Sequence, residues 1–178
     1  QQLLASNPGS TRASLLSAAG RLVEERQQRE TEAVVAALRP LRVDWSAGES
    51  EGNAQITATV SINGNGNELR AGESARLVVR VTNNGTATLH RLRGTSKSDN
   101  YLLHDHEFVF GRLEPGASRT WEVPICIPAG FVARTDPVTI EFEDMAEREL
   151  PNASTRVSVN ALERPSFAYG VQLVDSRG

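Results

Sequence analysis

The stretch LRAGESARLVVRVTNNGTA at residues 69–87 decides the fold. Within it, Leu77, Val79 and Val81 alternate with mostly polar residues. Successive side chains of a β-strand point to opposite faces, so this pattern predicts a strand with one buried face. The residues Asn-Asn-Gly at 83–85 then favour a tight turn. The stretch therefore predicts a strand followed by a change of direction.

The same two-residue alternation recurs along the chain on both sides of this stretch. Its apolar positions are Ile56, Ala58, Val60 and Ile62; Phe108 and Phe110; Trp121, Val123, Ile125 and Ile127; Val138, Ile140 and Phe142; Val157, Val159 and Ala161; and finally Phe167, Tyr169, Val171 and Leu173. No helical pattern separates these segments, whereas a parallel sheet would need crossover helices. The sequence predicts a mainly β protein: an immunoglobulin-like antiparallel β-sandwich of seven to eight strands at residues 54–178.

Two prolines indicate where one of these strands lies in its sheet. Pro124 and Pro128 fall within and just after the strand that contains Trp121. Proline has no backbone N–H and cannot donate to a central ladder. We therefore expect this strand at a sheet edge or at a bulge.

Residues 1–40 predict a helical segment that docks on other surfaces. Ser10 or Thr11 can cap a helix that runs to Arg39, before Pro40. The predicted docking face consists of Leu15, Leu16, Leu22, Val23, Val34, Val35 and Leu38. Residues 24–32 between these two groups are polar, so the helix has two apolar ends and a solvated middle, in which four-residue spacing pairs Glu25 with Arg29 and Arg26 with Glu30.

The flanking segments complete the predicted organisation. Residues 41–53 are polar and contain glycine, which is typical of a linker. Residues 1–6 resemble the last turn of an earlier helix, which Asn7-Pro8-Gly9 would end. The start carries no signal-peptide pattern, and we expect the chain to be a fragment of a longer protein or a processed product.

Composition excludes several classes of function. The 178 residues carry a net charge of −3, which argues against a nucleic-acid partner. No stretch approaches the roughly 18 consecutive apolar residues of a membrane span. Cys126 is the only cysteine, so no intramolecular disulfide can form. The sequence contains no nucleophile elbow, phosphate-binding loop or HExxH motif, and it predicts neither a catalytic site nor a cofactor.

Three polar clusters could bind something, and each has a simpler interpretation. His104 and His106 would point the same way on a strand and could share a metal ion, but a polar loop explains them as well. The acidic residues at 141–149 fit the solvated face of a strand better than a calcium site. The best candidate for a recognition loop is the run Lys97, Ser98, Asp99 and Asn100.

Residues 69–87 and the segment FGRLEPGASRTWEVPICIP at 110–128 also carry a family resemblance. Together they resemble bacterial immunoglobulin-like modules related to the CARDB (cell-adhesion-related) domain. The first stretch matches the hairpin of such modules, and the second matches their leucine-x-Pro-Gly turn and the strand after it. The resemblance implies the sandwich fold and leaves the function open, since these modules serve many hosts.

A narrower resemblance joins LRVDWSAG at 41–48, HRLRGTSKSDN at 90–100 and FVFGRLEPG at 108–116. These segments are similar to the region after the catalytic core of some bacterial carboxyl-terminal processing (tail-specific) proteases, periplasmic serine enzymes with a PDZ domain. The Ser–Lys catalytic pair of that family has no counterpart, because Lys97 is the only lysine and lies outside the family's nucleophile context. The resemblance implies a non-catalytic end of such an enzyme.

Partners and location follow from that resemblance as expectations. The implied location is the periplasm or cell envelope. The implied partners are the chain's own protease core or another envelope protein, and an extended peptide substrate could add to an edge strand. The alternative is a freestanding surface module of the adhesin type that binds protein or glycan. Such a module would have no reason to expose Leu15, Leu16, Leu22 and Val23 unless it self-associated.

Overall fold

The computed structural model describes residues 8–64 and 66–163. One long helix, α1 (Pro8–Leu38), and a short 3-10 turn, η1 (Arg39–Leu41), precede a β-sandwich. The helix predicted from the sequence is confirmed, although Pro8 begins it instead of ending an earlier one. Proline fits the first helical position, because the N–H that it lacks would have no helical partner there. Residues 1–6 lie outside the described residues.

Eight strands form the sandwich within the described residues. Sheet A contains β1 (Ile56–Ile62), β3 (Ser74–Asn83) and β6 (Ser118–Cys126), in the order β1-β3-β6. Sheet B has the order β2-β8-β7-β4-β5 and contains β2 (Glu68–Arg70), β4 (Leu89–Lys97), β5 (Glu107–Leu113), β7 (Arg134–Glu143) and β8 (Ala153–Asn160). All neighbours are antiparallel except β2 and β8. The predicted antiparallel immunoglobulin-like sandwich is therefore the observed fold.

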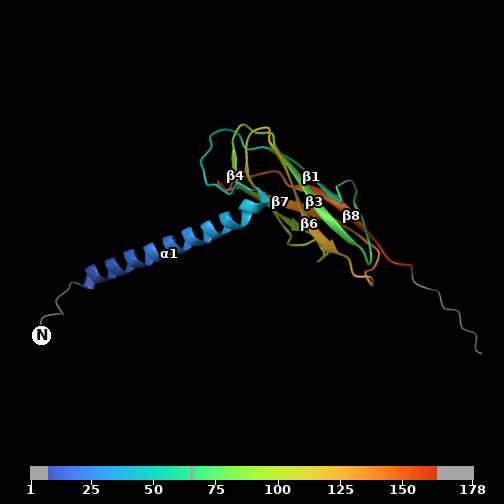
Figure 1. Cartoon of the computed structure of the whole chain (residues 1–178), viewed down its shortest axis with the longest axis horizontal. Helices are drawn as coiled ribbons and strands as arrows, with labels where there is room; N and C mark the ends of the chain where they lie inside the picture. The colour runs from blue at the N-terminus through green and yellow to red at the C-terminus, as the bar shows by residue number, and fades with distance from the viewer. Residues whose placement is uncertain (1–7, 65, 164–178) are drawn as a thin grey trace, which may run out of the picture.

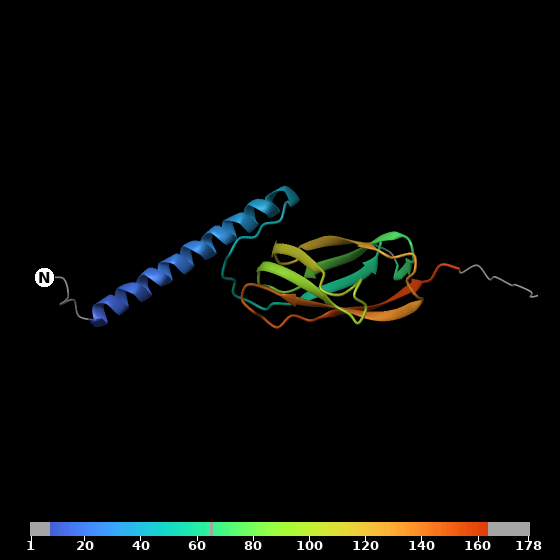
Figure 2. The ribbon, with the colours of Figure 1, turned by 90° about the horizontal axis from the view of Figure 1, so that it is seen from below.

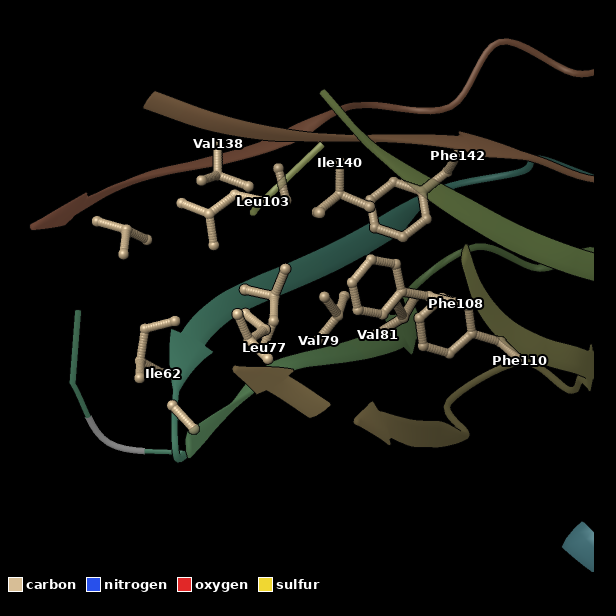
Figure 3. Packing of buried hydrophobic residues seen from close by; sticks show 14 of the residues in the cluster. Ile62, Leu77, Val79, Val81, Leu103, Phe108, Phe110, Val138, Ile140 and Phe142 are labelled. Atoms are coloured by element: carbon tan, nitrogen blue, oxygen red, sulfur yellow. The ribbon is translucent and has the colours of Figure 1, made fainter. Parts of the chain in front are cut away.

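The core lies between the two sheets. Figure 3 shows the side chains of β3 pointing toward those of β7 across the sandwich. The fully buried members include Leu77, Val79, Val81, Val138 and Ile140. Phe110 and Phe142 add a tilted ring contact, with centroids 6.0 Å apart. The residues whose alternation predicted strands thus supply the inward faces of both sheets.

The expected edge position of the Trp121 strand is confirmed. That strand is β6, which lies at one edge of sheet A, and Pro124 is opposite Arg76 of β3. Two strands were not predicted: β2, which has three residues, and β4, whose sequence is too polar to show a clear alternation. The strand predicted at Phe167–Leu173 falls outside the described residues.

The segment between α1 and β1 lies along the sandwich. Val43 is buried, and the backbone N–H of Arg112 donates to the carbonyl of Asp44 at 2.6 Å. Gly111 adopts φ +72°, and a Cβ there would overlap the Asp44 carbonyl. Farther along, the backbone N–H of Thr88 donates to Ser50 Oγ at 2.7 Å. The contacts of Val43 and Asp44 fix the end of α1 to β5, and α1 extends outward from that end (Figures 1 and 2).

Gly111→Ala tests this attachment. The substitution forces alanine into a left-handed backbone conformation and pushes its Cβ against the Asp44 carbonyl. Strain and overlap together should lower the free energy of unfolding by about 3 kcal/mol, measured by denaturant titration. The control is Gly116→Ala, because Gly116 has φ +77° and open space around it, and we expect a loss of about 1 kcal/mol. Equal losses in the two variants would contradict the attachment.

Candidate interaction surfaces

The N-terminal half of α1 exposes an apolar face. Leu15 and Leu16 are each 65% exposed, Leu22 is 63% exposed and Val23 is 55% exposed. Their spacing places them on one side of the helix. Nothing among the described residues covers them, and α1 points away from the sandwich at this end (Figures 1 and 2). We call these four side chains the α1 tip face.

The middle of α1 is solvated, as the sequence predicted. Arg26 pairs with Glu30 at 2.7 Å, and Arg29 pairs with Glu25 at 3.7 Å. All four side chains are more than 60% exposed, so each pair contributes only a few tenths of a kcal/mol. The pairs therefore support the helix without joining it to another element.

The C-terminal end of α1 faces the sandwich across a small cavity. The cavity has a volume of about 170 Å³, and Val34 and Leu38 of α1 line it together with Trp45, Gly94 and Val109. Val34 is still 42% exposed, and Val35 lines a separate open groove on the helix with Thr31 and Ala36. The second half of the predicted docking face thus divides between the sandwich and solvent.

The predicted recognition loop combines exposed and buried residues. Asp99 is exposed, and Lys97 donates from Nζ to Asp105 Oδ1 at 2.9 Å. That hydrogen bond raises the pKa of Lys97 and holds the pKa of Asp105 below its ordinary value. A lysine that keeps its proton more firmly is a poor general base, so Lys97 does not suit a Ser–Lys catalytic pair.

Asn100, the fourth residue of that patch, is fully buried. Its Nδ2 donates to Asp136 Oδ2 at 3.0 Å, and its Oδ1 accepts from the backbone N–H of Leu102 at 3.1 Å. Arg134 Nε also donates to Asp136 Oδ2, at 2.6 Å. Asn100 therefore joins the β4–β5 loop to the start of β7 and cannot contact a partner directly.

The two histidines do not form a chelating pair. Residues 101–106 make a turn instead of a strand, and Asp105 has φ +55°, which ends the alternation of side chains. His104 Nδ1 accepts from the backbone N–H of Ser98 at 3.2 Å, and His106 Nε2 lies 2.8 Å from the Leu102 carbonyl oxygen. The strand interpretation of this pair is therefore wrong, and the polar loop is what forms.

The acidic residues at 141–149 are distributed over a strand face and a turn. Glu141 and Glu143 are exposed on β7, and Glu143 pairs with Arg93. Asp144 is buried and accepts from Arg148 Nε at 2.7 Å. Across residues 8–64 and 66–163, no three histidine, cysteine or acidic side chains gather closely enough to hold a metal ion.

No known protein family matches the sequence, and no curated protein matches it. Several solved structures are similar to part of the chain. Red sea bream transglutaminase is 14% identical with a TM-score of 0.47, over 62% of this chain and 15% of that enzyme. Spo0M, a sporulation control protein from Bacillus subtilis, is 14% identical with a TM-score of 0.42, over 63% of this chain and 51% of that one.

The CARDB domain of PF1109 from Pyrococcus furiosus is also among them. It is 16% identical with a TM-score of 0.47, over 62% of this chain and all of that domain. At these identities the similarities concern the fold only. A CARDB domain is therefore one of the solved structures to which the chain is similar, and none of the structures named here is a processing protease. Within the described part of the chain, no helix combines the length and apolar character that a membrane crossing requires.

The sequence did not reveal Arg134 and Asp136 as members of the loop network. Asp136 lies in β7 next to Pro137 and resembles any polar residue at a strand start. Its burial could not be predicted locally, because its partner Asn100 is 36 positions away in the sequence. A clue was available in the short run Arg-Thr-Asp, since a buried carboxylate in a β protein needs an arginine or an amide close by.

Asn100→Ala should destabilise the sandwich by about 2 kcal/mol, because it leaves the Leu102 N–H and part of the Asp136 carboxylate without a partner. Denaturant unfolding measures the loss. Asp99→Ala, one residue away and exposed, should stay within about 0.5 kcal/mol of the unmodified chain. A small effect of Asn100→Ala would show that the buried network is not needed.

Lys97→Gln should raise the pKa of Asp105 toward its ordinary value, because it removes the ammonium group whose hydrogen bond and charge stabilise the carboxylate. In the unmodified chain, the lowered pKa of Asp105 adds to the free energy of unfolding at pH values above the pKa that Asp105 has in the unfolded chain. This contribution is lost as the pH falls through the pKa that Asp105 has in the folded chain. Carboxyl carbon NMR titration of Asp105 measures the change. Arg112→Gln is the control, and an unchanged Asp105 in Lys97→Gln would contradict the pairing.

Proposed function

We propose that this chain is a non-catalytic docking module, which attaches to a partner protein through the α1 tip face. The exposure of that face carries the proposal. Leu15, Leu16, Leu22 and Val23 together present a large apolar surface on one side of a projecting helix. Contiguous exposed apolar surface of this kind is typical of a protein-binding site. An amphipathic helix fits an apolar groove in its partner through side chains at this spacing.

The host we propose is a tail-specific serine protease of the bacterial periplasm or envelope, with this chain as its C-terminal accessory region. The support is the sequence resemblance of residues 41–48, 90–100 and 108–116. In the fold these segments meet at the base of α1: Arg91 Nε donates to the Trp45 carbonyl at 3.2 Å, and Trp45 lines the same cavity as Val109. The three sequence segments that carry the resemblance therefore lie around the junction between α1 and the sandwich, which sets the direction of the helix.

The proposed mechanism is positioning. A helix of 31 residues spans about 46 Å, so its tip can bind the protease core while the sandwich lies well away from it. The attachment of Val43 and Asp44 to β5 keeps the base of the helix fixed to the sandwich. The sandwich would then hold a substrate or second partner at a set distance from the core.

The α1 tip face can be tested by charge substitution. Leu15→Glu combined with Leu22→Glu should abolish capture of the partner from envelope extracts, because two carboxylates would have to be desolvated at the interface. The control is Ser17→Glu with Gln28→Glu, which places the same charges on the opposite side of α1 and should leave capture intact. Circular dichroism checks that the helix persists in both variants. Equal capture by all three proteins would contradict docking through this face.

The identity of the host is tested separately by immunoblotting the native envelope with antiserum against this chain. A band well above the mass of this chain, with peptides from a serine protease core, supports the protease assignment. A band at the mass of the chain alone would contradict it and favour a freestanding module. In that case, concentration-dependent dimerisation that Leu15→Glu abolishes would identify self-association as the role of the α1 tip face.

A further inference from the structure

The outer edge of β1 has unpaired backbone groups. Ile62 and Gly66 form an isolated bridge in which each N–H donates to the other's carbonyl, at 3.1 Å or less. Meanwhile the N–H of Asn63 donates to Arg76 of β3 at 2.9 Å, so the backbone groups of Ile62 itself point away from β3. Hydrogen-bonding direction alternates along a strand, so Ala58 and Val60 also direct N–H and C=O away from β3. Within the described residues nothing pairs with them.

The other three edges of the two sheets, as the described strands form them, are protected. The edge of β6 contains Pro124, and β2 has only three residues, two of them charged. The edge of β5 is bent at Gly111, and Asp44 covers it at Arg112. By contrast, β1 reads ITATVSI, with no charge, proline or glycine, and pairs with β3 in an unbroken register. Proteins usually guard such an edge against strand addition, and β1 carries none of these guards.

The core-facing side chains of β1 are only partly covered along this edge. Ala58 and Val60 face the core, yet both remain partly exposed because none of the described strands lies outside β1. An added strand with apolar side chains at alternate positions would cover them. Its remaining side chains would lie on the outer face of sheet A, beside Thr57 and Thr59.

Charge on that outer face indicates which segment fits. Arg80 is exposed directly opposite Thr59 and makes no ion pair with any described residue. The neighbouring Arg76 lies 3.5 Å from Glu122, so its charge is partly matched. An added strand would lie two strand spacings from Arg80, roughly 10 Å, within reach of a long acidic side chain. The face therefore favours a strand that carries carboxylates, and a second copy of this chain would place its own uncharged β1 there instead.

We propose that the outer edge of β1, residues 56–60, binds an extended peptide segment of a partner protein as the fourth strand of sheet A. The segment has apolar side chains at alternate positions and acidic side chains between them. Backbone hydrogen bonds to Ala58 and Val60 supply the attachment, and Arg80 supplies the preference for acidic residues. The proposal does not depend on the docking role of α1, because β1 belongs to the sandwich.

The test uses a short capped peptide in which valine alternates with glutamate, added to the full chain. In the free chain, amide hydrogen exchange should be fast at Ala58 and Val60 and slow at Thr57 and Thr59. The peptide should slow exchange at Ala58 and Val60 specifically. Two further versions of the peptide are N-methylated at all odd or at all even residues, which blocks the backbone N–H groups along one edge or the other. The version blocked on the edge that pairs with β1 should lose binding, and the other version should retain it.

Two variants test the residues on the protein side. Ala58→Pro removes an outward N–H without removing a bond to β3, and it should weaken peptide binding about tenfold while Thr57 and Thr59 stay protected. Arg80→Glu should reverse the preference from the glutamate peptide to its lysine counterpart. Arg156→Glu, the same change at an exposed arginine on β8 in the other sheet, should leave the preference unchanged.

Three results would overturn the proposal. The first is absence of binding at millimolar peptide, and the second is retention of binding by both N-methylated versions. The third is protection of Ala58 and Val60 without peptide in a concentration-dependent dimer, which would assign the edge to a second copy of the chain. Leu15→Glu with Leu22→Glu should bind the peptide normally, so failure of the α1 docking role cannot be mistaken for failure at β1.

Discussion

The apolar contact between β3 and β7 holds the two sheets together, and the surfaces described above depend on it. With Cys126 as the only cysteine, no disulfide can join the sheets. Leu77 and Val79 from β3 and Val138 and Ile140 from β7 belong to one core cluster, and all four are completely buried. Because burial of apolar area is the main stabilising force, this layer determines how the edges and loops are placed relative to one another.

A second constraint acts where α1 joins the sandwich. Here a few specific backbone contacts decide the geometry: the Arg112 N–H on the Asp44 carbonyl, the glycine at 111 that permits their approach, and the buried Val43. The cavity beside Leu38 and Trp45 shows that packing between helix and sheet is incomplete. The direction of α1 therefore rests mainly on the attached segment that follows it, and much less on contact between the helix and the strands.

The alternation of apolar and polar residues was enough to predict most of the strands, because the apolar residues that become buried belong to the strand itself. The same local logic found the helix and its two exposed ion pairs. It could not place Asn100, whose burial depends on Asp136 in another strand. It left two interpretations of His104 and His106 open, and the polar loop is the one that forms, with Asp105 in a left-handed conformation. The free edge of β1 was hidden for a similar reason, since strand order depends on pairings between distant segments.

The two proposed surfaces differ in chemistry, and this difference bears on how the module would work. The α1 tip face offers side chains, and an apolar side-chain contact depends on the shape and sequence of one partner. The β1 edge offers backbone groups, which any extended segment can pair with, and only Ala58, Val60 and Arg80 add a preference. A surface of the first kind suits a fixed attachment, whereas the second suits exchangeable segments of varied sequence. The helix lies between them, so binding at one surface leaves the other free.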